Sequence, residues 1–162
     1  MAADFVFSES NGVGEVVSDD IANINFGSVD ASALVPATYP ITRGNNSFTK
    51  YLRGKFTGSF TEISNILFWK SAGAYKTEEN IDAEANAIYA TPTAVDMAGT
   101  TIPITSGTAL AIESFEGAAT IVSGGSGVSG YTGYIKMQTQ TTSNTESGAV
   151  NSKTLTMQYD ET

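Results

Sequence analysis

Four carboxylates crowd into residues 78–84 and form the densest group of potential cation ligands in the chain. They are Glu78, Glu79, Asp82 and Glu84. Calcium takes roughly six to eight oxygen ligands, so such a group is a candidate calcium site. The spacing matches no calcium-binding loop, and a solvated acidic surface is the interpretation that the charge pattern favours. The Asp19–Asp20 pair has the same two interpretations, and we expect neither a metal ion nor a cofactor.

The residue inventory excludes the commonest catalytic centres. The chain has no histidine and no cysteine, so Ser–His–Asp catalysis, Cys–His catalysis, thiolate metal sites and disulfides are all impossible. A glycosidase pair would need two acids on opposed rigid strands, but the acids here lie mostly in predicted loops and chain ends. A phosphate-binding loop would need a lysine after its glycines, and the run GGSGVSGYTG has none. We therefore expect a protein that is not an enzyme.

Most of the basic residues lie in one segment, residues 43–76, whose six bases and one acid (6 − 1 = +5) contrast with a net charge of -9 for the whole chain. The six bases are Arg43, Lys50, Arg53, Lys55, Lys70 and Lys76. One interpretation is a solvated strand face on which Arg53 and Lys55 prevent edge-to-edge pairing. The other is a docking patch for an acidic partner surface, including an acidic region of a second copy. Nucleic acid is disfavoured as a partner because its phosphates would meet an acidic chain.

The only tryptophan, Trp69, follows Phe68 in the most hydrophobic stretch of the sequence. The pattern favours a place for both side chains in the core. The alternative for Trp69 is an exposed aromatic platform for a sugar ring. A carbohydrate-binding module that uses Trp69, or Tyr131 and Tyr134, is therefore a second functional hypothesis.

The elements that position these residues are predicted to be short β-strands. Only 15% of the residues are charged, and the polar remainder is rich in Thr, Ser, Asn and Gly, which favour strands and turns. The clearest strand spans 48–57, where Phe48, Leu52 and Phe56 share one face. Gly54 lies midway on that face, which predicts a bulge or an aromatic ring lying over it.

The remaining elements are less uniform. Further strands are predicted at Ala3–Phe7, Ile21–Gly27, Ile66–Lys70, Thr100–Thr105 and Thr108–Ile112. Tyr131–Thr141 and Lys153–Tyr159 both alternate and are predicted to pair as an antiparallel hairpin. Loops are expected at 8–20 and 28–47. The least strand-like segment, Thr77–Ala87, leaves open a short helix or a strand over Ala85–Ala90.

About eight short strands with almost no helix predict an all-β fold, a single antiparallel β-sandwich of jelly-roll or immunoglobulin-like arrangement. One domain over residues 1–162 is expected, with an N-terminal edge strand or arm and a flexible loop over 117–130. The start MAADFVFSES lacks the features of a signal peptide. No apolar stretch approaches the roughly 18 residues of a membrane helix, so we expect no membrane partner.

Two segments resemble virion structural proteins of tailed bacteriophages. They are the run YPITRGNNSFTKYLRGKFTGSFTEISNILFWKSAGAYKTEENI followed by YATPT, and the ending GYIKMQTQTTSNTESGAVNSKTLTMQYDE. The resemblance extends over residues 39–93 and 130–161. The resemblance implies a capsid decoration (cement) protein, with a tail tube, neck or adaptor subunit as the neighbouring possibility. It also implies assembly in the host cytoplasm, a place on the virion, and the major capsid protein or other virion subunits as partners. The same resemblance implies a homo-oligomer or many copies bound to a lattice.

Overall fold

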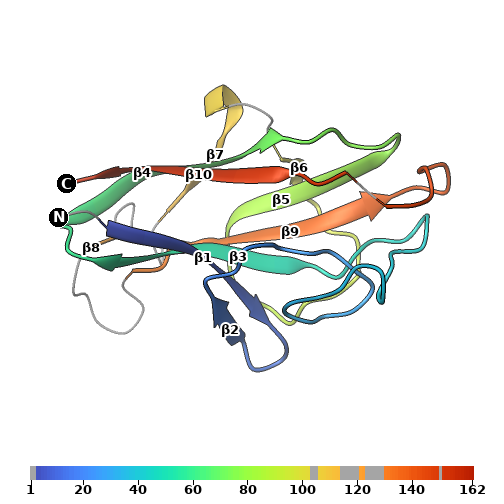
Figure 1. Ribbon diagram of the computed structural model, residues 1–162, viewed down its shortest axis with the longest axis horizontal. Coiled ribbons are helices and arrows are strands. Elements are labelled where there is room, and N and C mark those ends of the chain that lie inside the picture. The colour runs from blue at the N-terminus through green and yellow to red at the C-terminus, as the bar shows by residue number, and fades with distance from the viewer. Residues whose placement is uncertain (1–2, 103–105, 114–120, 123–129, 150) are drawn as a thin grey trace.

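The computed structural model is a sandwich of two antiparallel β-sheets (Figure 1). It describes residues 3–102, 106–113, 121–122, 130–149 and 151–162. Within these ranges the only helical element is η1 (Ser106–Thr108), a short 3-10 helix. No helix in the same ranges is long and apolar enough to cross a membrane. The predicted all-β antiparallel sandwich with little helix is confirmed.

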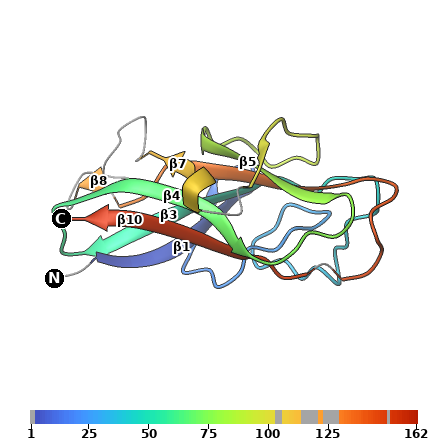
Figure 2. The same ribbon diagram turned by 90° about the horizontal axis from the view of Figure 1, so that it is seen from above.

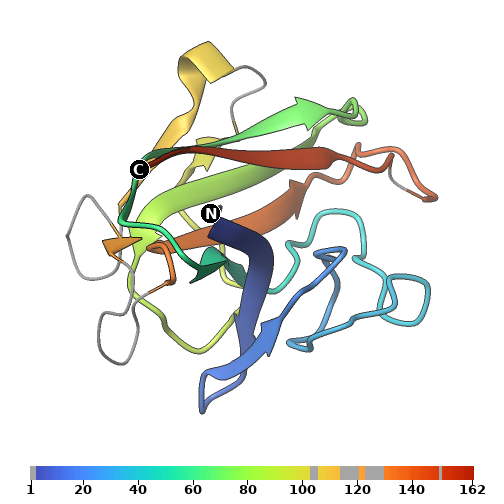
Figure 3. The ribbon, with the colours of Figure 1, turned by 60° about the vertical axis from the view of Figure 1, so that its left-hand side comes forward.

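The two sheets differ in size. In spatial order the six-stranded sheet consists of β2 (Val16–Asp19), β1 (Ala3–Asn11), β3 (Lys50–Gly58), β9 (Tyr134–Thr141), β5 (Glu79–Ala87) and β6 (Thr100–Thr101). The four-stranded sheet consists of β10 (Thr154–Glu161), β4 (Glu62–Ala72) and β7 (Leu110–Ile112), with β8 (Ile121–Val122) also paired to β4. Figure 2, a view from above, shows β4 and β10 running along the long axis on the side nearer the viewer, with β1 and β3 behind them. Both chain ends lie together at one end of the sandwich (Figure 1), the end that comes towards the viewer in Figure 3.

The strand predicted at 48–57 is β3, which lies inside the larger sheet between β1 and β9. Leu52 and Phe56 are buried on its inner face, as predicted. A methyl group added at Gly54 would lie only 2.8 Å from the ring of Phe5 and 2.8 Å from the sulfur of Met157. The predicted aromatic ring over Gly54 is therefore confirmed. The β1–β3 register is continuous past Gly54, whereas on the opposite side of β3 the pairing shifts by one residue between Leu52–Ile135 and Lys55–Tyr131.

The core lies between the sheets, and its buried side chains come from β3, β4, β5, β7 and β9 and from Ile102, which follows β6. Its buried members are Leu52, Phe56, Ile63, Ile66, Phe68, Ile81, Ala83, Ile102, Ile112, Ile135 and Met137. At the end where the termini lie, aromatic rings close the gap between the sheets: the Phe56 and Tyr159 rings meet edge to face with centroids 4.7 Å apart. This geometry is favourable for aromatic pairs beyond their burial of area.

The predicted hairpin of Tyr131–Thr141 and Lys153–Tyr159 is wrong. Both strands exist, as β9 and β10, but β9 pairs with β3 and β5 in the larger sheet. β10 pairs with β4 in the smaller sheet. The connecting loop therefore crosses from one layer to the other. Alternation shows which side chains face the core, but it does not show which strand lies alongside.

The segment predicted as least strand-like, Thr77–Ala87, contains β5, an interior strand of the larger sheet. The predicted helix is wrong, and of the strand predicted over Ala85–Ala90 only Ala85–Ala87 is strand, as the end of β5. Ile81 and Ala83 lie on the inner face and are buried. Asn80, Asp82 and Glu84 point outward, because successive side chains of a strand alternate between faces. Weak strand propensity is overridden here by hydrogen-bonded neighbours on both sides.

Other boundaries also differ from the predictions. The predicted loop over 8–20 instead contains the end of β1 and all of β2, and β1 is paired along its length, so the described N-terminal residues form a strand and no arm. The predicted strand Ile21–Gly27 is irregular, although Ile24 and Phe26 still pack against the core. The segment 28–47 is irregular, as predicted. Most of the loop predicted over 117–130, and residues 103–105 of a predicted strand, lie outside the described residues.

Candidate docking surface

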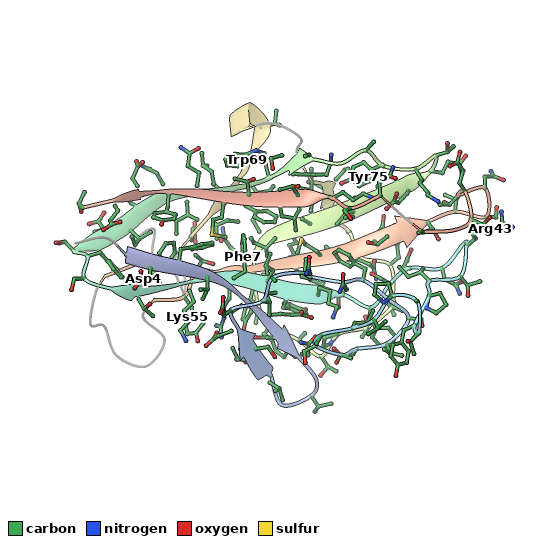
Figure 4. All side chains as sticks on the ribbon, viewed as in Figure 1. Asp4, Phe7, Arg43, Lys55, Trp69 and Tyr75 are labelled. Carbon is green, nitrogen blue, oxygen red and sulfur yellow. The ribbon has the colours of Figure 1, made fainter. Side chains whose placement is uncertain are left out.

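The structure divides the six predicted docking residues into three that are buried and three that are not. Lys50, Arg53 and Lys70 are only 0%, 5% and 6% exposed. Lys55 and Lys76 are half-buried, and Arg43 is exposed. Figure 4 shows Arg43 at the end of the molecule opposite the chain termini, far along the long axis from Lys55. The six residues therefore do not form one exposed patch.

Lys50 points to the inner side of the larger sheet. Its Nζ lies 2.6 Å from Oε1 of Glu9 and donates a hydrogen bond to the carbonyl of Ala31, also at 2.6 Å. Glu9 lies opposite Leu52 on β3, so both ions share the face of the core. The sequence already predicts this face for Lys50. In a strand, side chains two residues apart share a face, and Lys50 is two residues from the core residue Leu52.

Arg53 lies on the outer face of the same sheet between two tyrosine rings. The guanidinium carbon is 4.0 Å from the ring centroid of Tyr131 and 4.5 Å from that of Tyr134, a favourable cation–π geometry. Burial and a hydrogen bond to the Glu15 carboxylate raise the pKa of Tyr134. The two tyrosines of the sugar-binding hypothesis are thus already occupied by Arg53.

Lys70 lies at the inner side of β4, away from Arg53. Its Nζ donates to the carbonyl of Gly73 at 2.5 Å and lies 5.0 Å from the Tyr75 ring centroid. Lys153 approaches the same ring at 5.2 Å and forms a buried ion pair with Glu79 at 2.5 Å. Lys70 and Lys153 thus both contact the Tyr75 ring, whose position is labelled in Figure 4.

Lys55 is the best-exposed base within β3, and it is already paired. Its Nζ lies 2.5 Å from Oδ2 of Asp19, which also accepts hydrogen bonds from Ser8 and Tyr131. Partial burial works to raise the pKa of Asp19, but these donors together hold it below the usual 3.8. The carboxylate of Asp19 is therefore engaged by its own chain. Elsewhere, Lys76 donates to the carbonyl of Ser147 at 3.1 Å.

The acidic group at 78–84 does not converge on one point. Glu79 faces inward to Lys153, whereas Asp82 accepts from Asn80 and Thr101 on the outer side. Glu84 lies 3.6 Å from Lys136. In the part of the chain that the structure describes, no group of three or more His, Cys, Asp or Glu side chains is placed to hold a metal ion.

The longest free backbone edge belongs to β10. This strand of eight residues pairs with β4 on one side and with no described strand on the other. The opposite chain end lies beside it: the Ala3 N–H donates to Oε1 of Glu161 at 2.9 Å, and the Phe5 and Tyr159 ring centroids are 5.8 Å apart. The N-terminal end of β1 is thus held against the C-terminal end of β10, the strand with the unpaired edge.

The same end of the molecule is acidic. We call it the chain-end corner and define it by Asp4, Glu62, Asp160 and Glu161. Backbone hydrogen bonds between Glu62 and Thr162 hold Glu62 beside the end of β10. None of the four carboxylates takes part in an ion pair within the described chain. Burial, and then the negative charge of Glu161, raise the pKa of nearby Tyr159.

Trp69 is not in the core, contrary to the sequence-based expectation, whereas Phe68 is completely buried. The indole lies half-buried on the outer face of the smaller sheet, opposite Thr156 of β10 (Figure 4). Leu67, two residues earlier on the same face, is also half-buried. The buried cluster could accept only every second residue of β4, and Phe68 occupies that position.

A shallow polar hollow lies at the end opposite the chain termini. It has a volume of about 370 Å³ and adjoins a second hollow of about 340 Å³ through Gly44 and Asn46. Asp96 in the second hollow accepts hydrogen bonds from the side-chain amides of Gln140 at 2.6 Å and Asn46 at 3.4 Å. The lining of the second hollow offers neutral hydrogen-bonding side chains and the Asp96 carboxylate, and these groups already form hydrogen bonds with one another.

No family model, curated protein or solved structure matches this chain. The class of the protein is therefore defined by its architecture, an all-β sandwich of a six-stranded and a four-stranded sheet.

Proposed function

We propose that this protein is a non-enzymatic structural protein of a virion that binds a phage capsid in many copies and stabilises it, as a decoration (cement) protein. The observation that supports this proposal best is the free edge of β10 beside the paired chain termini. An edge strand can extend its sheet with a segment of a partner. The resemblance of residues 39–93 and 130–161 to virion proteins supports the same assignment.

The physical requirements of such a protein agree with this sandwich. A lattice-bound protein gains strength from many simultaneous contacts, so each copy needs a stable body and one accessible contact surface. The core spans both sheets, and buried ion pairs join β1 to β3 and β5 to the residue before β10. The docking surface then lies at the chain-end corner and does not involve the six basic residues as one patch.

Co-sedimentation with capsids of a candidate source phage tests the proposal. Purified protein is mixed with capsids lacking it, and the pellet is assayed for saturable occupancy and for resistance of the capsid to heat. Saturation at a fixed number of copies per capsid, with a higher temperature of capsid disruption, supports decoration. A protein that stays in the supernatant with every capsid tested contradicts it.

The assembly state of the isolated protein separates decoration from the neighbouring virion roles. Sedimentation velocity of a decoration protein shows a monomer or a small closed oligomer that pellets only with capsids. Spontaneous growth into rings or tubes instead indicates a tail tube, neck or adaptor subunit. Electron microscopy of the same sample distinguishes the two shapes directly.

A carbohydrate-binding module is the second candidate, and the position of Trp69 favours it. The indole lies on the outer face of β4, opposite Thr156, where stacking and hydroxyl contacts to a sugar are both available. Titration of an oligosaccharide panel against tryptophan fluorescence tests it, with Trp69→Phe as the variant lacking the only indole. A spectrum unchanged by every sugar contradicts this candidate and leaves the virion proposal standing.

A further inference from the structure

Among the edges of the two described sheets, that of β10 differs from the others in length. β2 has four residues, β6 has two and β7 has three, whereas β10 has eight. Proteins commonly protect exposed edges by keeping them short or by placing lysine or proline on them. The sequence of β10, TLTMQYDE, contains neither residue, and its two charged residues, Asp160 and Glu161, lie together at its C-terminal end. β10 therefore offers the longest unpaired edge among the described strands; the next longest is the side of β1 from Ala3 to Val6, beyond the reach of β2.

The register of β10 limits the part that a partner strand can use. Its pairing with β4 shifts between Thr154 and Leu155, and again between Gln158 and Asp160. Such irregularities bend and twist a strand. The regular stretch from Leu155 to Gln158 lies between them. A partner segment that pairs with it need be only about four to six residues long, given the strand rise of about 3.3 Å per residue.

Charge and apolar surface indicate the chemistry of that segment. The regular stretch leads into the chain-end corner. Asp160 and Glu161 of this corner are the last two residues of β10, and the carboxylates of the corner have no cationic partner in the described chain. Leu155 and Met157 of the same strand face the core, where they are only half-buried at this edge. An incoming strand with basic residues alternating with apolar ones would match both features, because strand side chains alternate between faces.

We propose that the β10 edge binds a short, extended, basic segment of a partner protein by β-strand addition. Backbone hydrogen bonds to Leu155–Gln158 provide the pairing, and the carboxylates of the chain-end corner select lysine or arginine at the end of the segment near Asp160. This inference rests on the proposed function only for the identity of the partner: if the protein decorates a capsid, the basic segment belongs to a capsid subunit. It reverses the polarity expected from the sequence, in which a basic patch on this chain met an acidic partner.

A labelled peptide of alternating lysine and valine, six residues long, is the probe for this edge. Fluorescence anisotropy with the full chain at low salt is expected to show saturable binding, weakened at least tenfold when glutamate replaces lysine in the peptide. A fully N-methylated peptide of the same sequence, which cannot donate backbone hydrogen bonds, is expected not to bind. Hydrogen exchange is expected to slow at the amides of residues 155–158 on binding of the unmodified peptide.

Two charge variants locate the contact. Asp160→Asn with Glu161→Gln removes two charges while keeping hydrogen-bond acceptors for Asn65 and the Ala3 N–H, and should weaken peptide binding at least threefold. The matched control, Glu78→Gln with Glu146→Gln, removes two exposed charges elsewhere on the chain and should leave binding unchanged. Equal losses in both variants, or equal binding of the N-methylated peptide, would show non-specific attraction and overturn the proposal.

The remaining outcomes are also decisive. A dimer of the free protein that forms through residues 155–158 would mean that the edge accepts a second copy instead of a basic partner. Capsid binding that persists although the peptide fails to bind would refute the β10 inference and leave the proposed function intact. Peptide binding without capsid binding would support the edge inference and refute the decoration role.

Discussion

Lys50 and Glu9 form an ion pair on the inner face of the larger sheet, with 2.6 Å between Nζ and Oε1 and with both side chains almost completely buried. The carbonyl of Ala31 also accepts a hydrogen bond from Nζ, so the segment between β2 and β3 closes over the pair. A basic residue in a predicted docking patch thus has a structural role inside the protein.

Removing one partner of this pair should be costly. Lys50→Met leaves the Glu9 carboxylate buried without its cation, which typically destabilises a protein by about 3–5 kcal/mol. The free energy of unfolding measured by urea titration should fall by that amount. The double variant Lys50→Met with Glu9→Leu should recover much of the loss, because no unpaired charge remains. A single variant as stable as the parent would show that the pair is open to water.

Gly54 should not tolerate a methyl group. In Gly54→Ala the new carbon would meet the Phe5 ring and the Met157 sulfur at 2.8 Å, and overpacking of this kind costs about 1–3 kcal/mol. Gly14→Ala is the matched control, since no atom lies within 4 Å of its added methyl. Thermal unfolding of the two variants should therefore give a clearly lower Tm only for Gly54→Ala. Similar Tm values would contradict the close packing of the sheets at this position.

Stability in acid should depend on Asp19. Its pKa is held below 3.8 in the folded chain, so the carboxylate contributes stability above the unfolded pKa, and this contribution is lost as the pH falls through the folded value. Asp19→Asn should flatten the pH dependence of the unfolding free energy below about pH 4. The comparison variant is Asp20→Asn, whose side chain is exposed one residue away. An equal effect of both variants would argue against a specific role of the Lys55, Ser8 and Tyr131 contacts.

Stability in base should depend on Tyr89. Burial, followed by the negative charges of Asp30 and Glu15, raises its pKa to about 12. The folded chain therefore keeps a proton that the unfolded chain loses above pH 10, so the unfolding free energy falls as the pH rises from about 10 to 12. Tyr89→Phe should reduce this slope by at most about one proton, although it also removes the hydrogen bond to the Gly12 carbonyl. Tyr39→Phe is a suitable control because Tyr39 is exposed.

The strand positions of the core could be read from the sequence with some success. Leu52 and Phe56 alternate along β3 and face the core, because a strand in a sandwich must bury one face and the side-chain period is two. The crowding at Gly54 was predictable for the same reason. Composition, rich in small polar residues and poor in charge, was enough to exclude a helical fold and histidine- or cysteine-based chemistry.

Which strands pair with each other, and which charged side chains are buried, were decided only by the tertiary structure. β9 and β10 have the alternation of a hairpin but lie in different sheets, since backbone hydrogen bonding is the same for any neighbour and local sequence does not select one. Lys50 and Arg53 are residue types expected on the surface, but both are buried. The energetic cost of burying their charges is offset by Glu9 for Lys50 and by the Tyr131 ring for Arg53, and both partners are distant in sequence. A charged residue becomes stable inside a protein only when folding brings such a partner to it, and the fold alone determines which charges remain outside.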